Sequence, residues 1–505
     1  MIAKNVVVVG GGIAGLTASA LLAHEGFSVI LFEAHTQLGG CAGTFRRGSY
    51  VFDVGATQVA GLETGGIHQR LFKYLNSPIP QAHLLDPACI VDLGDNSEPI
   101  HLWYNQQKWQ SERERHFPGS ESFWSLCAWL HKSNWGFVER DPVLPVGNLW
   151  DIWQLTKALR PETICTSVFS RMSIADLLKL CRCDQDKRLK KFLDIQLKLY
   201  SQESADQTAA LYGATVLQMA QEPRGLWHLN DSMQALSDLL EKSFLRDGGK
   251  LMLGRTVNSL VKDSEENDWE IQVSDKQNNV AQFHSSNVIF SLPPQLLLDL
   301  IPTSGGMTMN YRQSLESLPV PTGALVFYGA IHRSNLPENC PNHIQLLDEN
   351  LDSLFISISS DGDGRAPSGQ ATVIASAFTN TKYWLDLSTL EYQCKKEKVA
   401  AQILSVLNQW LDLSSGDWLH QEVATPKSFK RWTGRPNGSV GGIPQTPSHF
   451  GPFGLPSRTP LAGLWLCGDS IYPGEGTAGV SQSALMACRQ LMASQGRHLD
   501  LSAII

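Results

Sequence analysis

The sequence predicts an α/β protein built on a parallel β-sheet, with an α+β domain inserted into it. Residues 5–9 are a β-branched run with the length of a strand that is buried on both faces. A glycine-rich turn and an alanine- and leucine-rich helix, residues 13–24, follow at once. A second apolar strand, residues 27–32, completes a β–α–β unit. Two long segments without this pattern, about 73–224 and 295–424, leave room for the inserted domain.

The turn after the first strand carries a G-x-G-x-x-G pattern. Gly10 permits the tight turn, Gly12 lets the backbone approach a pyrophosphate, and Gly15 lets helix and strand pack closely. The helix begins at Ile13 and Ala14, where unpaired N–H groups and a partial positive charge favour phosphates. The pattern therefore predicts a Rossmann-like sheet that binds a dinucleotide.

An acid ends the second strand, as this interpretation requires. Glu33 stands at the spacing from the glycines where a carboxylate accepts hydrogen bonds from ribose hydroxyls, and Ala34 lies beside it. Strand, glycines, helix, strand and acid in this order make the prediction much stronger than the glycines alone.

A second glycine cluster, Gly39 and Gly40, resembles the doublet that FAD proteins of the glutathione-reductase class place beside the phosphates of the cofactor. Many relatives have arginine at the next position, which here is Cys41. We expect Arg46 or Arg47 to offset the missing charge. The alternative is a flexible surface turn.

The far end of the chain favours FAD over NAD. A short apolar strand, residues 464–467, runs into Gly468 and Asp469, and a helix begins near residue 481 after Gly479 and Val480. This resembles the second FAD fingerprint, in which the aspartate binds a ribityl hydroxyl and the helix N-terminus points at the flavin and its phosphates.

A third piece lies between these two. In such flavoproteins the residue that matches Val257 meets the adenine through its backbone, and a run like residues 288–294 returns the chain to the central sheet. The sequence thus predicts a glutathione-reductase/amine-oxidase-type FAD domain in three parts and a substrate domain in two. The FAD-binding parts are residues 1–72, 225–294 and 425–505, and the substrate parts are residues 73–224 and 295–424.

Several segments together resemble the phytoene desaturase and carotene isomerase flavoproteins over essentially the whole chain. These segments are residues 39–43, 52–58, 227–236, 438–444 and 472–476. Residues 53–68 are most similar to the cyanobacterial carotenoid 3′,4′-desaturases, and the cis-carotene isomerases are the alternative. The resemblance implies FAD as cofactor, a carotenoid as substrate, and quinone or oxygen as electron acceptor. Isomerisation would use the reduced cofactor and give no net oxidation.

Few residues stand out as catalytic. Glu475 lies in the loop after Asp469 and is the candidate acid or base, although a solvated or helix-capping carboxylate is an equally good interpretation. Gln58, His68 and Tyr472 are weaker candidates for substrate contact, and His68 fits a structural role better.

Composition excludes some partners. The chain has 505 residues, a net charge of −8 and a pI of about 6.0, so nothing indicates a nucleic-acid partner. Its ten cysteines have no metal-ligand spacing, and we expect reduced thiols and no metal site. Residues 5–23 are uncharged and follow Lys4, as in a signal peptide, but the glycines interrupt them. We expect a protein that is not secreted.

A carotenoid dissolves only in lipid, so we expect peripheral contact with a membrane on its cytoplasmic side. Residues 186–200 are a candidate for that contact, because apolar side chains share one face of a helix with basic residues nearby. The apolar residues are Leu189, Phe192, Leu193, Leu197 and Tyr200. An ordinary amphipathic helix with a solvated basic side is the alternative.

Two other classes of function use the same fold. A lipid-binding escort protein would lack a working flavin site, whereas the glycines and Asp469 are intact here. An amine oxidase would need a polar channel and often has a lysine beside the flavin, and the sequence carries no mark of either.

Overall fold

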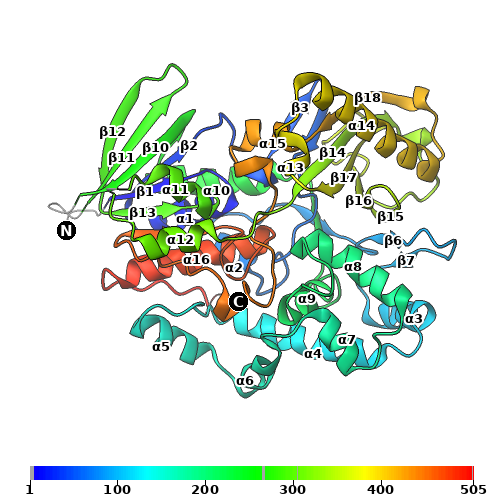
Figure 1. Ribbon diagram of the computed structural model, residues 1–505, viewed down its shortest axis with the longest axis horizontal. Coiled ribbons are helices and arrows are strands. Elements are labelled where there is room, and N and C mark those ends of the chain that lie inside the picture. The colour runs from blue at the N-terminus through cyan, green and yellow to red at the C-terminus, as the bar shows by residue number, and fades with distance from the viewer. Residues whose placement is uncertain (1–4, 264–267, 304, 503, 505) are drawn as a thin grey trace.

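A parallel five-stranded sheet forms the centre of one half of the protein (Figure 1). The computed structural model describes residues 5–263, 268–303, 305–502 and 504. The strand order is β19–β13–β1–β2–β9, and every neighbouring pair is parallel. The strands are β1 (Asn5–Val9), β2 (Ser28–Glu33), β9 (Lys250–Leu253), β13 (Asn287–Phe290) and β19 (Leu464–Leu466). This confirms the predicted α/β class.

Both faces of this sheet are covered. In β1, Val6 and Val8 pack under α1 (Ile13–His24), α10 (Gln234–Arg246) and α16 (Thr477–Ala493). Val7 and Val9 face the opposite way, into a core shared with a three-stranded antiparallel sheet. That sheet consists of β10 (Arg255–Lys262), β11 (Trp269–Asp275) and β12 (Val280–Ser285). Alternate side chains of a strand point to opposite faces, which explains why a continuous apolar run was needed here.

The uncharged N-terminal stretch is therefore part of the fold. Residues 5–23 form β1 and most of α1, and nearly all their side chains are buried. Lys4, which the signal-peptide interpretation used, lies outside the described residues.

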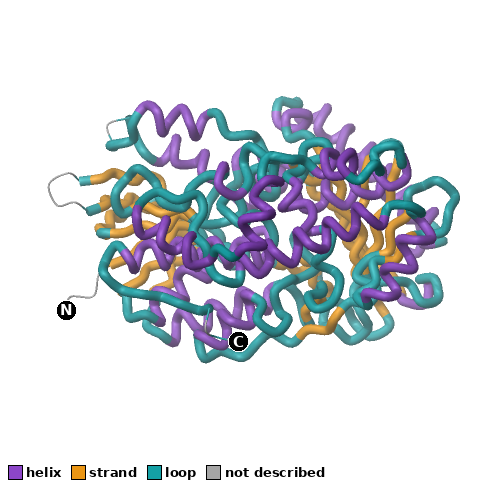
Figure 2. Tube along the Cα trace, turned by 90° about the horizontal axis from the view of Figure 1, so that it is seen from below, coloured by secondary structure: helices purple, strands orange, loops and turns teal. Residues whose placement is uncertain are grey.

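A seven-stranded sheet dominates the other half, in the order β18–β14–β17–β16–β15–β6–β7. Its strands are antiparallel except for the β15–β6 pair. They are β6 (Ile90–Asp92), β7 (Ile100–His101), β14 (Gly323–His332), β15 (His343–Asp348), β16 (Asp352–Ile358), β17 (Gln370–Thr379) and β18 (Trp418–Ala424). Strands from both predicted substrate segments thus share one sheet. The domain boundaries themselves stay a prediction. Figure 2 shows the strands gathered at the two sides of the molecule with helices between them.

Helices fill the lower part of Figure 1. They are α3 (Gln106–His116), α4 (Glu121–Val138), α5 (Leu149–Ala158), α6 (Pro161–Thr166), α7 (Ile174–Leu180), α8 (Lys187–Ser201) and α9 (Ala210–Val216). The remaining elements are β3 (Thr44–Arg47), β4 (Tyr50–Asp53), α2 (Ile67–Tyr74), β5 (Ala82–Leu84), β8 (Trp227–Leu229), α11 (Leu297–Leu300), α12 (Met309–Glu316), α13 (Lys382–Leu385), α14 (Thr389–Leu411) and α15 (Pro426–Thr433). Short 3-10 turns link some of them. Within the described ranges, none of the helices has the length and apolarity needed to cross a bilayer.

The helix expected to dock on a membrane does not present its apolar face to solvent. Leu189, Phe192, Leu193 and Leu197 of α8 are at most 1 % exposed and belong to a core that includes Trp109. Tyr200 packs against the same core. The expectation of docking through residues 186–200 is therefore wrong, because the protein's own helices cover the face that lipid would have to meet.

Candidate cofactor and substrate cavity

One cavity of about 1670 Å³ reaches from the glycine-rich turns to the helical part of the molecule. Ligand pockets commonly measure about 300–1,000 Å³, so this space exceeds the needs of one small ligand. The residues of its wall divide into a polar end near α1 and α16 and an apolar end near α5 and α9.

The polar end is built on the first glycine cluster. Gly12 is the N-cap of α1 and has no side chain to satisfy the first N–H groups of the helix. A methyl group added at Gly12 would meet open space, whereas one at Gly15 would lie 1.9 Å from the carbonyl oxygen of Gly10. Gly12 thus keeps a ligand's approach open, and Gly15 makes the close packing possible. Ile13 and Ala14 continue the cavity wall.

Glu33 lies at the mouth of this cradle. Its carboxylate accepts hydrogen bonds from the backbone N–H of Gly11, at 2.6 Å, and of His35, at 2.7 Å. These bonds orient a carboxylate that also lines the cavity, as contact with ribose hydroxyls requires.

The second glycine cluster lies directly beside the first. The Gly39 N–H donates to the Gly11 carbonyl oxygen at 2.9 Å, and a Cβ on Gly40 would come within 3.4 Å of the Gly12 Cα. Gly39 has a φ of +111°, which favours glycine. The structure describes this segment as an ordered wall of the cavity rather than as a surface turn.

A second helix N-terminus faces the same cavity. Gly476 precedes α16, and Thr477, Gly479 and Val480 of its first turn line the cavity together with Asp469. Two helix N-termini, a ribose-binding acid and glycines without side chains in the way offer what the diphosphate and sugar of a dinucleotide require. The residues present fit FAD.

The other predicted cofactor residues have different positions. Cys41 and Gly468 line the cavity, whereas Gly10, Gly15, Ala34 and Val257 do not. For Gly10 and Gly15 this agrees with a role in the turn and in packing. Val257 is buried in β10, and its contact with adenine stays a prediction.

The candidate substrate residues separate in the same way. Gln58 and Tyr472 line the cavity, and the Gln58 amide donates to the Ala88 carbonyl oxygen at 2.8 Å. His68 lies in α2, fully buried and outside the cavity wall, and burial lowers its pKa to about 4. The expectation that His68 contacts substrate is not supported by its position. It is a neutral imidazole of the core.

Glu475 lines the cavity and is held by two donors. The Gly442 N–H donates to its Oε1 at 3.0 Å, and the Gln202 side-chain amide donates to the same oxygen. Burial, reinforced by the negative charge of Asp469, raises the pKa of Glu475 well above its usual value. This shift favours the protonated form of the carboxyl, whose Oε1 is already occupied as an acceptor. This environment is not that of a solvated cap.

Arg435 is a residue of the polar end that the sequence patterns do not predict. Arg435 lines the cavity, and its guanidinium donates to Asp469 Oδ2, with Nη1 at 2.9 Å, and approaches Cys41 Sγ at 3.8 Å. Arg46 and Arg47, which were expected to offset the charge missing at Cys41, also line the cavity, but both are exposed to solvent. No local pattern marks Arg435, because only the tertiary fold brings residue 435 to residue 41.

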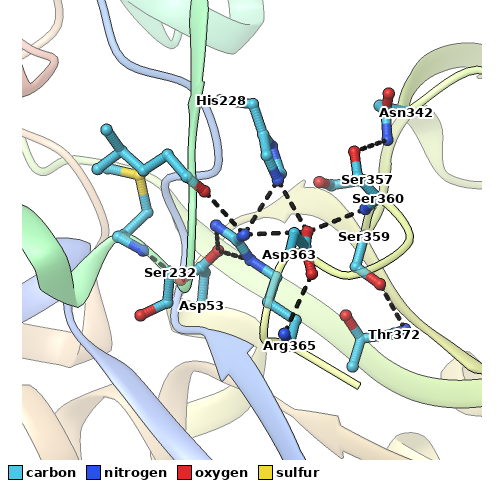
Figure 3. A network of polar contacts seen from close by, with 12 residues as sticks. Asp53, His228, Ser232, Asn342, Ser357, Ser359, Ser360, Asp363, Arg365 and Thr372 are labelled. Carbon is cyan, nitrogen blue, oxygen red and sulfur yellow. Dashed lines mark hydrogen bonds and ion pairs between the residues drawn. The ribbon is translucent and has the colours of Figure 1, made fainter. Parts of the chain in front are cut away.

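A buried polar network braces the wall between the two halves (Figure 3). Arg365 pairs with Asp53 of β4 at 3.0 Å and with Asp363 at 3.1 Å, and His228 of β8 lies 3.0 Å from Asp363. The Asp53 carboxylate also accepts the Met233 N–H at 2.9 Å, before α10. The loop that carries Arg365 also supplies Gly364 to the cavity wall, so the network positions that wall.

The apolar end of the cavity suits a long hydrocarbon. Its wall is made mostly of aliphatic and aromatic side chains from α5, α9 and the neighbouring strands. These residues include Leu155, Leu159, Tyr200, Leu211, Tyr212, Val216, Met219, Leu226, Phe355, Phe378 and Phe450.

Comparison with known proteins agrees with this arrangement. Residues 8–75 match the model of the NAD(P)-binding Rossmann-like domain. Prolycopene isomerase 2, chloroplastic, of an Oncidium hybrid cultivar is 25 % identical over 97 % of this chain and 84 % of its own. The 4,4′-diapolycopen-4-al dehydrogenase of Metabacillus indicus is 24 % identical over 52 % of this chain and 51 % of its own.

The fold is also found among solved structures. Cyclohexylamine oxidase from Brevibacterium oxydans superposes with a TM-score of 0.62 at 14 % identity, covering 97 % of this chain and 99 % of that one. At this identity the likeness concerns the fold alone. The cradle, the fold and the full-length sequence likeness agree in making the chain similar to carotenoid desaturase and isomerase flavoproteins, and FAD is its cofactor.

Proposed function

We propose that this chain is an FAD-dependent oxidoreductase that desaturates a long polyene, of the carotenoid 3′,4′-desaturase type. The observation that carries the proposal is the single cavity that joins the cofactor cradle at Gly12 and Asp469 to a wall of apolar side chains around Leu211. A rigid hydrocarbon in the apolar end would be directed toward the flavin end.

Desaturation removes hydrogen from two neighbouring carbons. Bound FAD supplies the acceptor for one of them as hydride. The other leaves as a proton, and quinone or oxygen serves as the final acceptor of the electrons. The chain's own part is to orient the polyene and exclude water, which the apolar wall does, and to manage the proton. Glu475 is the candidate for that last task, because its carboxyl group is buried in the cavity wall and would accept the proton in its ionised form.

The cis-carotene isomerase is the second candidate, and two observations favour it. A relative matched over nearly the whole chain is named a prolycopene isomerase. In addition, burial raises the pKa of Glu475, which favours its protonated form, and a protonated carboxyl can deliver a proton and take it back with no net oxidation.

Expression in bacteria that make lycopene or its cis precursors, with pigments resolved by chromatography and mass, separates these reactions. A product lighter by two hydrogens per new double bond supports the desaturase, and unchanged mass with altered geometry supports the isomerase. Gly12→Ala, which places a methyl group in the cofactor cradle, is the control that is expected to lower the yield of either product. Unaltered pigments with a flavin-loaded protein would contradict both.

Two further outcomes belong to other functions. A purified protein that stays colourless after reconstitution with FAD would favour a lipid-binding escort protein. Turnover of a soluble amine with release of peroxide would favour an amine oxidase.

Peripheral membrane contact, on the cytoplasmic side, is part of the same proposal, because the substrate resides in lipid. The surface that supports it is α5. This helix buries its polar residues Asp151 and Gln154 and exposes Leu149, Ile152 and Trp153, the reverse of an ordinary surface helix.

Polar bonds hold α5 in this orientation. Arg458 pairs with Asp151 at 3.1 Å, and the Arg489 guanidinium of α16 donates to Gln154 at 2.8 Å. The helix is thus anchored on its polar side.

The same segment also contributes to the cavity wall, through Leu155 and Leu159. Ile164 of α6 lines the cavity and is 57 % exposed, and Val168 next to it is 70 % exposed. Cations lie nearby at the surface in Lys157, Arg160 and Arg171, against one exposed acid, Glu162. Exposed apolar side chains on helices that also line the cavity, with exposed basic residues close by in the sequence, match an anionic lipid surface better than a second protein.

Flotation with phosphatidylglycerol vesicles tests this surface. The double substitution Ile152→Glu, Trp153→Glu is expected to abolish flotation, while Leu390→Glu, at a still more exposed leucine on α14, leaves it intact. Equal flotation of all three proteins would refute docking through α5. A change in oligomeric state on light scattering, without a change in flotation, would assign the face to self-association instead.

A further inference from the structure

The polar end of the cavity holds one buried arginine whose charge the reaction scheme does not use. Arg435 follows α15 and the left-handed Gly434, and it is only 9 % exposed. Its side chain lies in the cavity wall. It contacts Cys41, which follows the second glycine cluster, and Asp469.

The bonds of Arg435 are incomplete. Both terminal nitrogens donate to the same oxygen of Asp469, Oδ2, which leaves Oδ1 for another donor such as a ribityl hydroxyl. The Arg435 Nε is buried and has no hydrogen-bond partner among the described residues. A buried, unpaired donor of a charged group costs free energy unless a ligand satisfies it.

The negative charge that FAD brings to the polar end needs a nearby cation to balance it. FAD brings a diphosphate with two negative charges to a wall that already contains Glu33 and Asp469. Cys41, at the position next to the glycine doublet, adds no positive charge, and burial raises the pKa of its thiol so that it stays neutral.

The other basic residues of the cavity wall are paired with an acid, exposed to solvent or located in the other half of the molecule. Arg70 makes a bidentate pair with Asp141, with Nη1 3.1 Å from Oδ2. Arg47 is exposed and lies 3.0 Å from Glu422, and Arg46 is exposed beside it. Lys396 comes from α14 in the other half of the molecule.

We propose that Arg435 is an FAD-binding residue, which supplies from the far end of the chain the cation that position 41 lacks and holds Asp469 with Oδ1 free for the cofactor. This inference rests on FAD as the cofactor and not on the identity of the polyene. It is independent of whether the protein is a desaturase or an isomerase.

Titration of the apoprotein with FAD, followed by flavin fluorescence, tests the proposal without any substrate. Arg435→Gln is expected to raise the Kd for FAD about tenfold to a hundredfold, since hydrogen bonds to charged groups contribute about that much to binding. Arg47→Gln, the matched control on the same wall, is expected to change the Kd less than about twofold, because its exposed charge is screened.

A second variant, in which the arginine is moved from position 435 to position 41, gives the sharper test. Cys41→Arg added to Arg435→Gln is expected to restore most of the FAD affinity, because both side chains reach the same space. An unchanged Kd in Arg435→Gln would overturn the proposal. So would a lower unfolding temperature of the apoprotein with unaltered FAD affinity, which would make Arg435 only a structural partner of Asp469.

Discussion

The Gln202 side chain bonds to Glu475 across 273 residues of sequence. The Gln202 amide nitrogen donates to Glu475 Oε1 and, at 2.9 Å, to the Gly442 carbonyl oxygen. Its amide oxygen accepts the Thr322 N–H at 2.7 Å, so the amide cannot turn round without losing these bonds. Gln202 follows the end of α8 with a φ of 64°, and α8 thereby positions the acid of the cavity.

Replacing Gln202 by methionine removes the donor to Glu475 and keeps the length of the side chain. We expect kcat to fall about tenfold, because the hydrogen bond from the Gln202 amide that orients the Glu475 carboxyl group is lost. The hydrogen bond from Gln202 lowers the pKa of Glu475, so its loss raises that pKa further. The limb of the kcat–pH profile that reports the ionisation of Glu475 should therefore move to higher pH. A lower kcat with an unmoved profile would leave Gln202 a purely structural residue.

Replacing Glu475 by glutamine preserves the shape of the side chain and removes the ionisable carboxyl group. We expect kcat to fall by a factor of about 10² or more, as for a general acid or base, while the Kd for FAD stays within about twofold. Full activity of Glu475→Gln with normal flavin content would exclude Glu475 from proton transfer. Rescue by Glu475→Asp is not expected, because the shorter side chain cannot reach Gly442 and Gln202 together.

Two glycines of one motif should fail in different ways. Gly12→Ala places a methyl group in the open space of the cradle, so we expect an apoprotein of normal stability that binds FAD at least about tenfold more weakly. Gly15→Ala places it 1.9 Å from the Gly10 carbonyl oxygen, so we expect the fold itself to lose stability. Urea unfolding of the apoproteins and FAD titration distinguish the two. Equal behaviour of the variants would contradict these separate roles.

The pair between Arg365 and Asp53 is expected to stabilise the junction of the two halves (Figure 3). Arg365→Met leaves both Asp53 and Asp363 buried without their cation, which should cost about 3–5 kcal/mol of unfolding free energy. Arg115→Met, at a half-exposed pair with Glu98, should cost less than about 1 kcal/mol. Urea unfolding measures both. Similar losses of unfolding free energy in the two variants would show that the buried network stabilises the fold no more than an exposed ion pair does.

Stability should fall with pH through His68. Its pKa is about 4 in the folded protein, against 6.5 for an accessible histidine. The unfolded chain therefore binds the proton more readily, and folding loses stability as the pH falls from 6.5 toward 4. The loss from this residue is about 1.4 kcal/mol at pH 5.5. Unfolding of wild type and His68→Leu at pH 7.5 and 5.5 should show a smaller pH dependence in the variant, and equal dependence would refute the prediction.

Local requirements of the backbone made the cofactor cradle predictable. A tight turn, a close approach and an acid at the end of a strand each demand a residue type at a short spacing, so Gly12, Gly15 and Glu33 were recognisable in the sequence. Gly468 and Asp469 were recognised by the same reasoning, and Cys41 was seen as a place where charge is missing.

What the tertiary structure decided is the identity of distant neighbours. The amphipathic pattern of α8 satisfies a lipid surface or a protein core equally well, and only the helices packed on Phe192 determine that it is core. The inverted orientation of α5 depends on Arg458 and Arg489, which lie about 300 residues away in sequence. Periodicity reports which side chains share a face, but the free energy of that face depends on what the fold brings against it.

The glycine grip on FAD is therefore a property of the sequence, because each of its parts acts over a few residues. The cation that completes it is a property of the fold. Arg435 reaches Cys41 and Asp469 because three separate segments meet at one cavity, and no spacing along the chain encodes that meeting.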